Sequence, residues 1–252
     1  MSTRFVHLHT HSHYSLLDGL SKIDDLIAKA KSLNMDSLAL TDHGALYGAI
    51  EFYKKAKAAG IKPILGVEAY LTPGKYTDKT TATDEKRYFH LILLAKNKEG
   101  WRKLIKLVTK AHLDGYYYKP RVDKDLLREY AGDIICLSAC LGGELAQLLK
   151  NGRKGEAVKA AKEYQEIFGT ENLYIELGRH PNVPDCMRVD GELVALAREL
   201  SIPVVATADS HYLNTDDAEA HDILLCVQTG SKVNDTSRMS LRSDDYSLAS
   251  AE

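Results

Sequence analysis

The 252-residue sequence lacks the features that mark secreted, membrane-spanning or disulfide-bonded proteins. Its four cysteines are widely separated and form no CxxC pair, so neither a zinc ribbon nor a disulfide framework is indicated. The start MSTRFVHL has no apolar core of signal-peptide length, and no stretch approaches the ~18 apolar residues of a membrane span. We therefore expect reduced thiols, no membrane contact and a cytoplasmic location.

Neither sign of charge is in excess, and proline is scarce. The 33 basic residues nearly balance the 35 acidic ones, which excludes a strong field for non-specific binding of nucleic acid or an anionic membrane. A nucleic-acid substrate would have to be held locally. Six prolines and a hydrophobic content of 44% argue against disorder, and the length predicts one globular domain of barrel size.

Short apolar runs rich in β-forming residues alternate with helical patterns along most of the chain. The predicted strands are residues 5–9, 37–41, 61–71, 88–95, 133–138, 172–177 and 203–208. The predicted helices are residues 22–33, 45–59, 99–112, 153–168 and 190–200. This alternation favours a parallel sheet, and a closed barrel and an open doubly wound sheet fit the length equally well. No glycine-rich phosphate loop follows the first strand, which counts against the nucleotide-binding open sheet.

Two segments break the alternation. Residues 72–86 are polar and predict a mobile surface loop, and the pattern after His221 loses clear periodicity. We therefore expect a barrel domain over residues 1–220 and a C-terminal extension over 221–252. The ending SDDYSLASAE shows no closing element, which favours a fragment of a longer protein.

Polar residues lie at the ends of six of the predicted strands, where a parallel barrel collects its catalytic groups. They are His9 and His11, Asp42 and His43, Glu68, His90, Cys140, and Asp209 and His211. Imidazole, carboxylate and thiolate are the ligands of zinc and related ions, and a buried Glu68 needs such a partner. Singly, Cys140 could be a core hydrophobe and Asp42 a helix cap, but six agreeing strand ends favour a metal centre.

Longer segments of the sequence are more distinctive: FVHLHTHSHYSLLDG, LALTDHGALYGAIEFYKKAKAAGIKPILGVEAYL, YYYKPRVD, LSACLGGE, ADSHYL and LLCVQTG. Together they make essentially the whole chain resemble the PHP (polymerase and histidinol phosphatase) domain family. TDHG and HxH are general to its phosphoesterases, whereas LLDG and YKPR are closer to the N-terminal domain of bacterial replicative DNA polymerase III alpha subunits. The resemblance implies a distorted seven-stranded TIM-like (β/α)7 barrel with a metal centre at the C-terminal ends of its strands.

The resemblance also implies up to three divalent ions, which could be Zn, Mn or Fe. Matched to the family, the ligands divide into His9, His11, Glu68 and Asp209 for one ion, Glu68, His90 and Cys140 for a second, and Asp18, His43 and His211 for the third. No ligand of the family is missing. Catalytic roles are implied for His9, Asp18, His43 and Glu68.

The activity implied by this resemblance is phosphoester hydrolysis by a metal-bound hydroxide. In the polymerase branch this is a 3′-to-5′ exonuclease that proofreads single-stranded 3′ ends of DNA, with the rest of the alpha subunit and the replisome as partners. Residues 221–252 would lead toward a polymerase region whose active site this sequence does not contain.

Other interpretations of the same residues stay open. Candidate phosphate contacts are Arg87, Lys119 and Arg121, although ordinary surface packing explains these residues equally well. The domain could be a metal-stabilised scaffold without catalysis, or a small-molecule phosphatase such as histidinol phosphatase. In FVHLHTHSH, we expect His7 to pack beside the ligands and His13 to contact phosphate or water.

Overall fold

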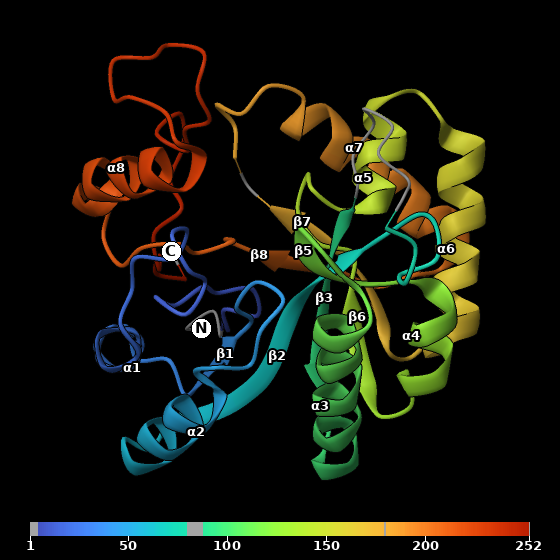
Figure 1. Ribbon diagram of the computed structural model, residues 1–252, viewed down its shortest axis with the longest axis horizontal. Helices are drawn as coiled ribbons and strands as arrows, with labels where there is room; N and C mark the ends of the chain where they lie inside the picture. The colour runs from blue at the N-terminus through green and yellow to red at the C-terminus, as the bar shows by residue number, and fades with distance from the viewer. Residues whose placement is uncertain (1–4, 80–87, 179, 252) are drawn as a thin grey trace.

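Figure 1 shows the computed structural model of the chain, which describes residues 5–79, 88–178 and 180–251. The strands of one curled sheet are β1 (Ser37–Leu40), β2 (Lys62–Leu71), β3 (Phe89–Ala95), β4 (Tyr116–Tyr117), β5 (Lys119–Val122), β6 (Ile134–Leu137), β7 (Leu173–Gly178) and β8 (Val204–Thr207). The helices around it are α1 (Ile23–Ser32), α2 (Ala49–Ala58), α3 (Lys98–Leu113), α4 (Lys124–Tyr130), α5 (Glu144–Lys150), α6 (Lys154–Phe168), α7 (Cys186–Leu200), the 3-10 turn η1 (Thr215–Asp217) and α8 (Ala218–Thr229).

Six of the seven predicted strands are confirmed to within one residue at each end. The seventh, residues 5–9, is not a regular strand, yet it occupies the seventh position of the barrel. It joins the two open edges of the sheet: Ala39 N–H donates to the His7 carbonyl on one side, and Ser210 N–H to the His9 carbonyl on the other. The predicted distorted seven-stranded TIM-like barrel is therefore confirmed, with its closure made by only a few backbone hydrogen bonds.

Strand β3 runs antiparallel to both of its neighbours, β2 and β6. This corrects the expectation of an all-parallel sheet. A parallel neighbour needs a crossover helix, and the described part of the connection between β2 and β3, residues 72–79, contains none. The reversal brings the N-terminal end of β3 to the edge where its neighbours have their C-terminal ends, so His90 at the start of β3 still faces the site edge.

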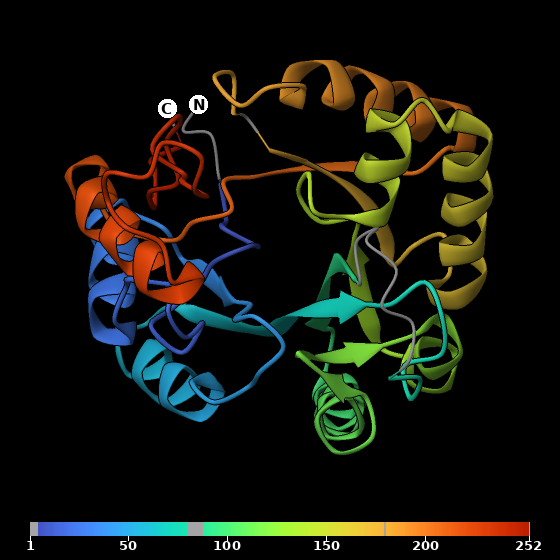
Figure 2. The same cartoon turned by 45° about the horizontal axis from the view of Figure 1, so that its top comes forward.

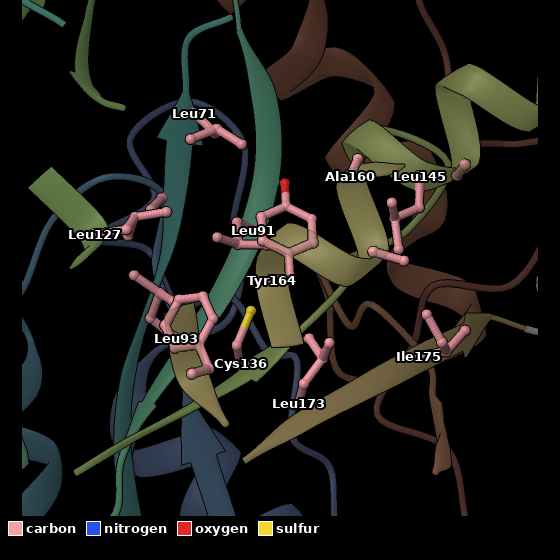
Figure 3. Packing of buried hydrophobic residues seen from close by; sticks show 14 of the residues in the cluster. Leu71, Leu91, Leu93, Leu127, Cys136, Leu145, Ala160, Tyr164, Leu173 and Ile175 are labelled. Carbon is pink, nitrogen blue, oxygen red and sulfur yellow. The ribbon is translucent and has the colours of Figure 1, made fainter. Parts of the chain in front are cut away.

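A continuous apolar core lies between the sheet and the outer helices. Figure 3 shows its centre, where Tyr164 of α6 lies over Leu91 of β3 and Ala160 of α6 lies beside Leu145 of α5. Alternate residues of the same strand, Ile92 among them, point to the barrel interior and form a second cluster there. Burial of this central cluster is the main contribution to the stability of the fold. Each Å² of apolar surface removed from water contributes about 25 cal/mol. All four cysteines are free, in agreement with the expected thiols.

The two irregular segments have different outcomes. Residues 72–79 form the predicted surface loop, with Arg121 donating hydrogen bonds to its carbonyls at Tyr76 and Asp78; the rest of that predicted loop lies outside the described residues. After residue 217 the chain forms α8, whose apolar residues are adjacent and leave Ile223 and Val227 exposed instead of marking one buried face.

The segment after α8 returns to the barrel. Leu248 joins the core cluster of α1 and α2, and the Ala249 carbonyl accepts a hydrogen bond from His7 Nε2. Both termini consequently lie close together (Figure 2). Among the described residues, no helix has the length and apolar character needed to cross a bilayer.

Candidate metal centre

Inward-facing rows of the barrel change from apolar to polar along their length. In β3 the row reads Leu94, Ile92 and His90, and in the chain leaving β8 it reads Val205, Thr207 and Asp209. Side chains two residues apart in a strand share a face, so each row delivers one ligand-type group to the same edge. The apolar parts of these rows close the bottom of the barrel, and the polar ends share a buried site.

Glu68 lies at the centre of that site and is 1% exposed. One carboxylate oxygen, Oε1, lies 2.7 Å from His90 Nδ1 and 3.3 Å from His9 Nε2. The other, Oε2, lies 2.7 Å from His43 Nδ1 and 3.2 Å from His11 Nε2. A single carboxylate therefore touches four imidazoles from three different parts of the chain.

Two further carboxylates flank Glu68. Asp209 Oδ1 lies 3.0 Å from His9 Nε2 and 3.4 Å from His11 Nε2. Asp18 Oδ2 lies 2.6 Å from His43 Nε2 and 3.7 Å from His211 Nε2. The three carboxylates thus share one set of histidines and form one continuous site.

Ligand-type atoms meet closely in three places. In each of three groups of residues, the ligand-type atoms all lie within 4.8 Å of one another. The groups are His9, His11 and Asp209; His43, Glu68 and His90; and His11, His43 and His211. The first contains three of the four residues expected for one ion and lacks Glu68. The other two combine residues that the resemblance assigns to different ions, since His43 lies with Glu68 and His90 as well as with His211. Asp18 reaches this set through His43, and Cys140 lines the same cavity outside the three groups.

The site contains buried polar atoms that have no hydrogen-bond partner among the described residues. They are Asp18 Oδ1, His43 Nδ1, Glu68 Oε1 and Oε2, His90 Nδ1 and Asp209 Oδ1. Several lie within 3 Å of one another without hydrogen-bond geometry, and a buried polar atom left unpaired costs about 1–3 kcal/mol. A divalent cation would satisfy imidazole and carboxylate lone pairs together, so these residues fit a metal ion.

A second layer of hydrogen bonds fixes the rings. His9 Nδ1 donates to Glu176 Oε1 at 2.7 Å, and Thr207 Oγ1 donates to the same oxygen at 2.6 Å. His11 Nδ1 donates to Ser15 Oγ at 2.8 Å, and that hydroxyl donates to Asp42 Oδ1. Because these bonds hold Nδ1 of each ring, Nε2 is the nitrogen that faces Glu68 and Asp209 and that can bind a cation.

His211 is oriented in the same way by the backbone. Its Nδ1 donates to the carbonyl of Asp209 at 2.8 Å, which leaves Nε2 facing Asp18. Asp209 has φ +47°, in the left-handed region, and this conformation brings its own carbonyl under the His211 ring. Backbone strain is thus located at a ligand-type residue, as is common at functional sites.

The charges of the site are strongly coupled. Burial opposes ionisation of Glu68, but His90, His43 and His9 outweigh it and hold the pKa of that carboxyl well below its usual range. Burial likewise lowers the pKa of His9, whereas Asp209, Glu176 and Glu68 raise it well above the ordinary value. Burial and the carboxylates raise the pKa of the Cys140 thiol well above its usual value, so thiolate ligation there requires a cation.

Without metal, the protein is expected to lose stability as the pH rises from 7 to 10. Burial lowers the pKa of His43, but Glu68 and Asp18 outweigh it and raise that pKa to about 9 from 6.5. A pKa that is higher in the folded state stabilises the protonated form, so this contribution is complete below about pH 6.5 and disappears above about pH 9. Measurement of Tm in chelator at pH values from 7 to 10 tests this expected loss of stability. His43→Gln should flatten the profile, and a flat wild-type profile would contradict the prediction.

Two of the three expected phosphate contacts, Lys119 and Arg121, lie within the described residues, and Arg87 lies outside them. Arg121 is 1% exposed, and its guanidinium donates to the carbonyls of Gly115, Tyr76 and Asp78, which gives it a structural role in place of the expected phosphate contact. Lys119 Nζ lies 5.3 Å from the centre of the Tyr70 ring, which stacks on His43, so of the two described candidates Lys119 is the one beside the site.

The outer histidines of the FVHLHTHSH run have separate roles. His7 is fully buried, with Nε2 donating to the Ala249 carbonyl, as expected of a packing residue. His13 is exposed and its ring packs on Tyr14, 4.3 Å between ring centres. Neither belongs to the three ligand groups found among the described residues.

Sequence reasoning missed Glu176 and His180. Glu176 is an acidic residue inside the apolar strand β7, and this is the same signal that identified Glu68 in β2. His180 follows β7, is 5% exposed and lines the same cavity as the ligands. A test of every apolar strand for one carboxylate would have found Glu176, whereas no spacing pattern identifies His180.

Replacing Glu176 by glutamine should weaken metal binding by about 10- to 100-fold, the usual cost of losing a partner that orients a ligand. An amide can donate to His9 Nδ1 and thereby favour the wrong tautomer of the ring. Competition with a fluorescent chelator measures the affinity, with Glu171→Gln as the control because Glu171 is exposed on the same segment. Unchanged affinity in Glu176→Gln would show that this hydrogen bond does not orient His9.

Comparison with known proteins places the chain. A family model described as PHP domain matches residues 7–180. The chain is 46% identical over 250 residues to the DNA polymerase III subunit alpha of Borreliella burgdorferi, covering 99% of this chain and 22% of that protein. It is 47% identical over 248 residues to the DNA polymerase III subunit alpha of Treponema pallidum, covering 98% and 21%. The chain therefore spans about a fifth of the length of these relatives.

A solved structure shares the fold. An amidohydrolase from Chromobacterium violaceum superposes with a TM-score of 0.50 at 15% identity, covering 82% of this chain and 87% of that one. The superposition shows a common fold. At 15% identity it carries no information on substrate.

Proposed function

The chain belongs to the PHP domain family, and from that premise we propose that it is the phosphoesterase domain of a bacterial replicative DNA polymerase III alpha subunit. Its activity is hydrolysis of phosphodiesters at the single-stranded 3′ end of DNA, a 3′-to-5′ exonuclease used in proofreading. The rest of the alpha subunit and the replisome are its partners, and the cytoplasm is its location. Residues 1–220 form the barrel domain, and residues 221–252 lead toward the polymerase region. Helix α8 spans the boundary between the two.

The observation that carries this proposal is the set of unpaired buried lone pairs at one end of a cavity. The cavity has a volume of about 540 Å³, and its lining includes Asp18, His43, Glu68, His90 and Asp209. Buried ligand atoms that also border a cavity can hold a metal and still admit a substrate. A purely structural site would be closed by protein on all sides.

The ligand set supports hydrolysis of a phosphoester. Bound Zn, Mn or Fe, in up to three positions, supplies Lewis acidity and a nucleophilic water near neutral pH. The nine residues expected from the family would hold these ions, and catalytic roles would belong to His9, Asp18, His43 and Glu68. Glu176 and Ser15 keep His9 and His11 in the required tautomers.

Lys119 provides a positive charge beside the site. Its ammonium lies against the face of Tyr70, and that ring stacks on His43 with 5.7 Å between ring centres. A phosphate beside His43 would lie within the field of this ammonium. Lys119 is therefore the substrate contact that we retain from the sequence.

An exonuclease assay on the purified chain tests the proposal. A single-stranded oligonucleotide labelled at its 5′ end should shorten one nucleotide at a time from its 3′ end when Zn, Mn or Fe is restored after chelation. Asp18→Ala and His9→Ala should abolish this. Absence of stoichiometric metal, or unchanged hydrolysis in both variants, would overturn the proposal, and faster release of phosphate from histidinol phosphate would favour a small-molecule phosphatase.

A scaffold role is the second candidate, and the connectivity of the site favours it independently. The ligand-type residues come from the N-terminal segment, from β2, from β3 and from the chain after β8, so one ion would join distant parts of a weakly closed barrel. A domain that binds metal and melts at lower temperature without it, but hydrolyses neither DNA nor histidinol phosphate, would have this role.

A further inference from the structure

The cavity at the metal centre continues beyond the ligands into an apolar part. We call this part the side pocket and define it by Leu141, Val183, Leu193, Met239 and Leu241. These residues come from the turn after β6, the segment before α7, α7 itself and the chain after α8. None of them is needed to hold an ion, so the mechanism proposed above leaves the side pocket without a role.

A line of aromatic rings connects the two parts of the cavity. The ring of Tyr246 lies edge-on to His211, with 5.9 Å between ring centres, and stacks on His180 at 4.2 Å. All three residues line the cavity. A molecule that places a phosphate at His211 would therefore extend along Tyr246 and His180 into the side pocket.

His180 is a buried polar group without a partner. Both ring nitrogens are buried, and neither has a hydrogen-bond partner among the described residues. The ring is fixed by its stacking on Tyr246 and by a tight turn in which His180 N–H donates to the Gly178 carbonyl. A buried ring nitrogen is normally hydrogen-bonded, which indicates that a ligand supplies the missing partner.

Asp190 adds an acceptor to the same wall. It lies on α7 one turn before Leu193 and is half-buried, and its carboxylate accepts a weak bond from Cys186 Sγ at 3.8 Å. No cation pairs with it within the described part of the chain. An acceptor beside apolar walls suits a flat ring that carries N–H groups on its edge.

We propose that the side pocket binds the base of the terminal nucleotide, with His180 and Asp190 hydrogen-bonding to its edge and Leu193 and Leu241 covering its faces. This inference rests on the proposed function and names the part of the substrate that the cavity recognises. A sugar alone is polar on all sides and would leave the apolar walls uncovered. Every natural base carries at least one N–H donor on its edge, so Asp190 can accept from any of them without selecting one.

Binding of a single nucleotide tests the inference. Thymidine 5′-phosphate and 2-deoxyribose 5-phosphate are titrated calorimetrically into the Mn-loaded 252-residue chain. The two ligands share phosphate and sugar and differ only by the base. The nucleotide should bind at least about 10-fold more tightly, because burial of its ring removes apolar surface from water. Equal affinities would overturn the inference.

Variants identify the pocket as the cause of this preference. Leu241→Trp should fill the side pocket and remove most of the 10-fold preference, and Asp190→Asn should reduce it. Glu199→Gln is the matched control, because Glu199 is exposed on α7 and does not line the cavity. If Leu241→Trp fails to fold, Asp190→Asn and His180→Ala decide the matter. A preference that is unchanged in the folded variants would overturn the inference.

Two chromogenic esters separate this inference from the proposed function. Thymidine 5′-(p-nitrophenyl phosphate) and methyl p-nitrophenyl phosphate release the same leaving group, and only the first carries a base. Tight nucleotide binding with hydrolysis of neither ester would remove the proposed function and leave the base site. Hydrolysis of both with equal kcat/KM, together with equal binding of the two phosphates, would remove the base site and leave the function.

Discussion

Glu68→Gln is expected to reduce release of nucleotides from a DNA 3′ end by more than about 100-fold. Loss of a group that only orients a ligand costs about 10- to 100-fold, and Glu68 is in direct contact with four histidines, so its loss should cost more. Glutamine keeps the size of the side chain but removes the charge that the imidazoles surround. Its amide nitrogen would also place a donor where two oxygens now present lone pairs.

The measurement is single-turnover hydrolysis of a labelled oligonucleotide, read beside the metal content of each protein. Glu99→Gln is the control, because Glu99 is an exposed carboxylate on α3 that pairs with Arg102. Activity within a few-fold of wild type in Glu68→Gln would exclude the central role given to this carboxylate. Loss of activity with full metal content would assign Glu68 to the reaction itself and not to metal retention.

Removal of metal is expected to lower the Tm of the chain by roughly 5–10 °C. An ion present at 100 times its Kd stabilises the folded state by about 2.7 kcal/mol, and a chain of this size gains about 2–4 °C in Tm for each kcal/mol. The physical reason is the crowding of Asp18, Glu68, Asp209 and Glu176 in one buried region. Their mutual repulsion is offset by protonated histidines alone when no cation is bound.

Asp209→Asn provides the matched control for this experiment. Asparagine adopts the left-handed backbone conformation of residue 209 readily, so the substitution removes the charge without straining the turn. Its Tm should fall less in chelator than that of the wild-type chain, because one of the expected ion sites has lost a ligand. Equal melting of the wild-type chain with and without chelator would contradict both the catalytic and the scaffold proposals, because both require the ion to bind the folded state.

The sequence identified much of the candidate site because strand alternation and strand ends are local features. His9 and His11, Glu68, His90, and Asp209 and His211 each follow from a position near the end of a predicted strand. A carboxylate inside an apolar strand was a sufficient signal for Glu68 and would have been one for Glu176. Arg121 shows the limit of this reasoning, since its motif suggested a phosphate contact and its burial places it under a loop instead.

Only the tertiary structure could reveal features that depend on segments meeting across the barrel. The reversal of β3 is set by the connection that precedes it. The barrel is closed at residues 7–10 by isolated backbone contacts, whereas the sequence pattern of residues 5–9 predicted a regular strand. The shared role of His43 in two ligand groups has the same origin. Such contacts join residues far apart in the chain, for which periodicity carries no information.

By itself, then, the sequence determined the longer strands, five of the helices, the family and the residue types near the strand ends, because hydrophobic periodicity and motif spacing are written along the chain. It did not predict α4, α5, α8, β4 or β5. The tertiary structure decided which histidines contact the same carboxylate, which hydrogen bonds fix their tautomers, and where a cavity remains beside them. Those properties depend on distances through space. The unpartnered His180 and the apolar side pocket exist only once β7, α7 and the chain after α8 are brought together.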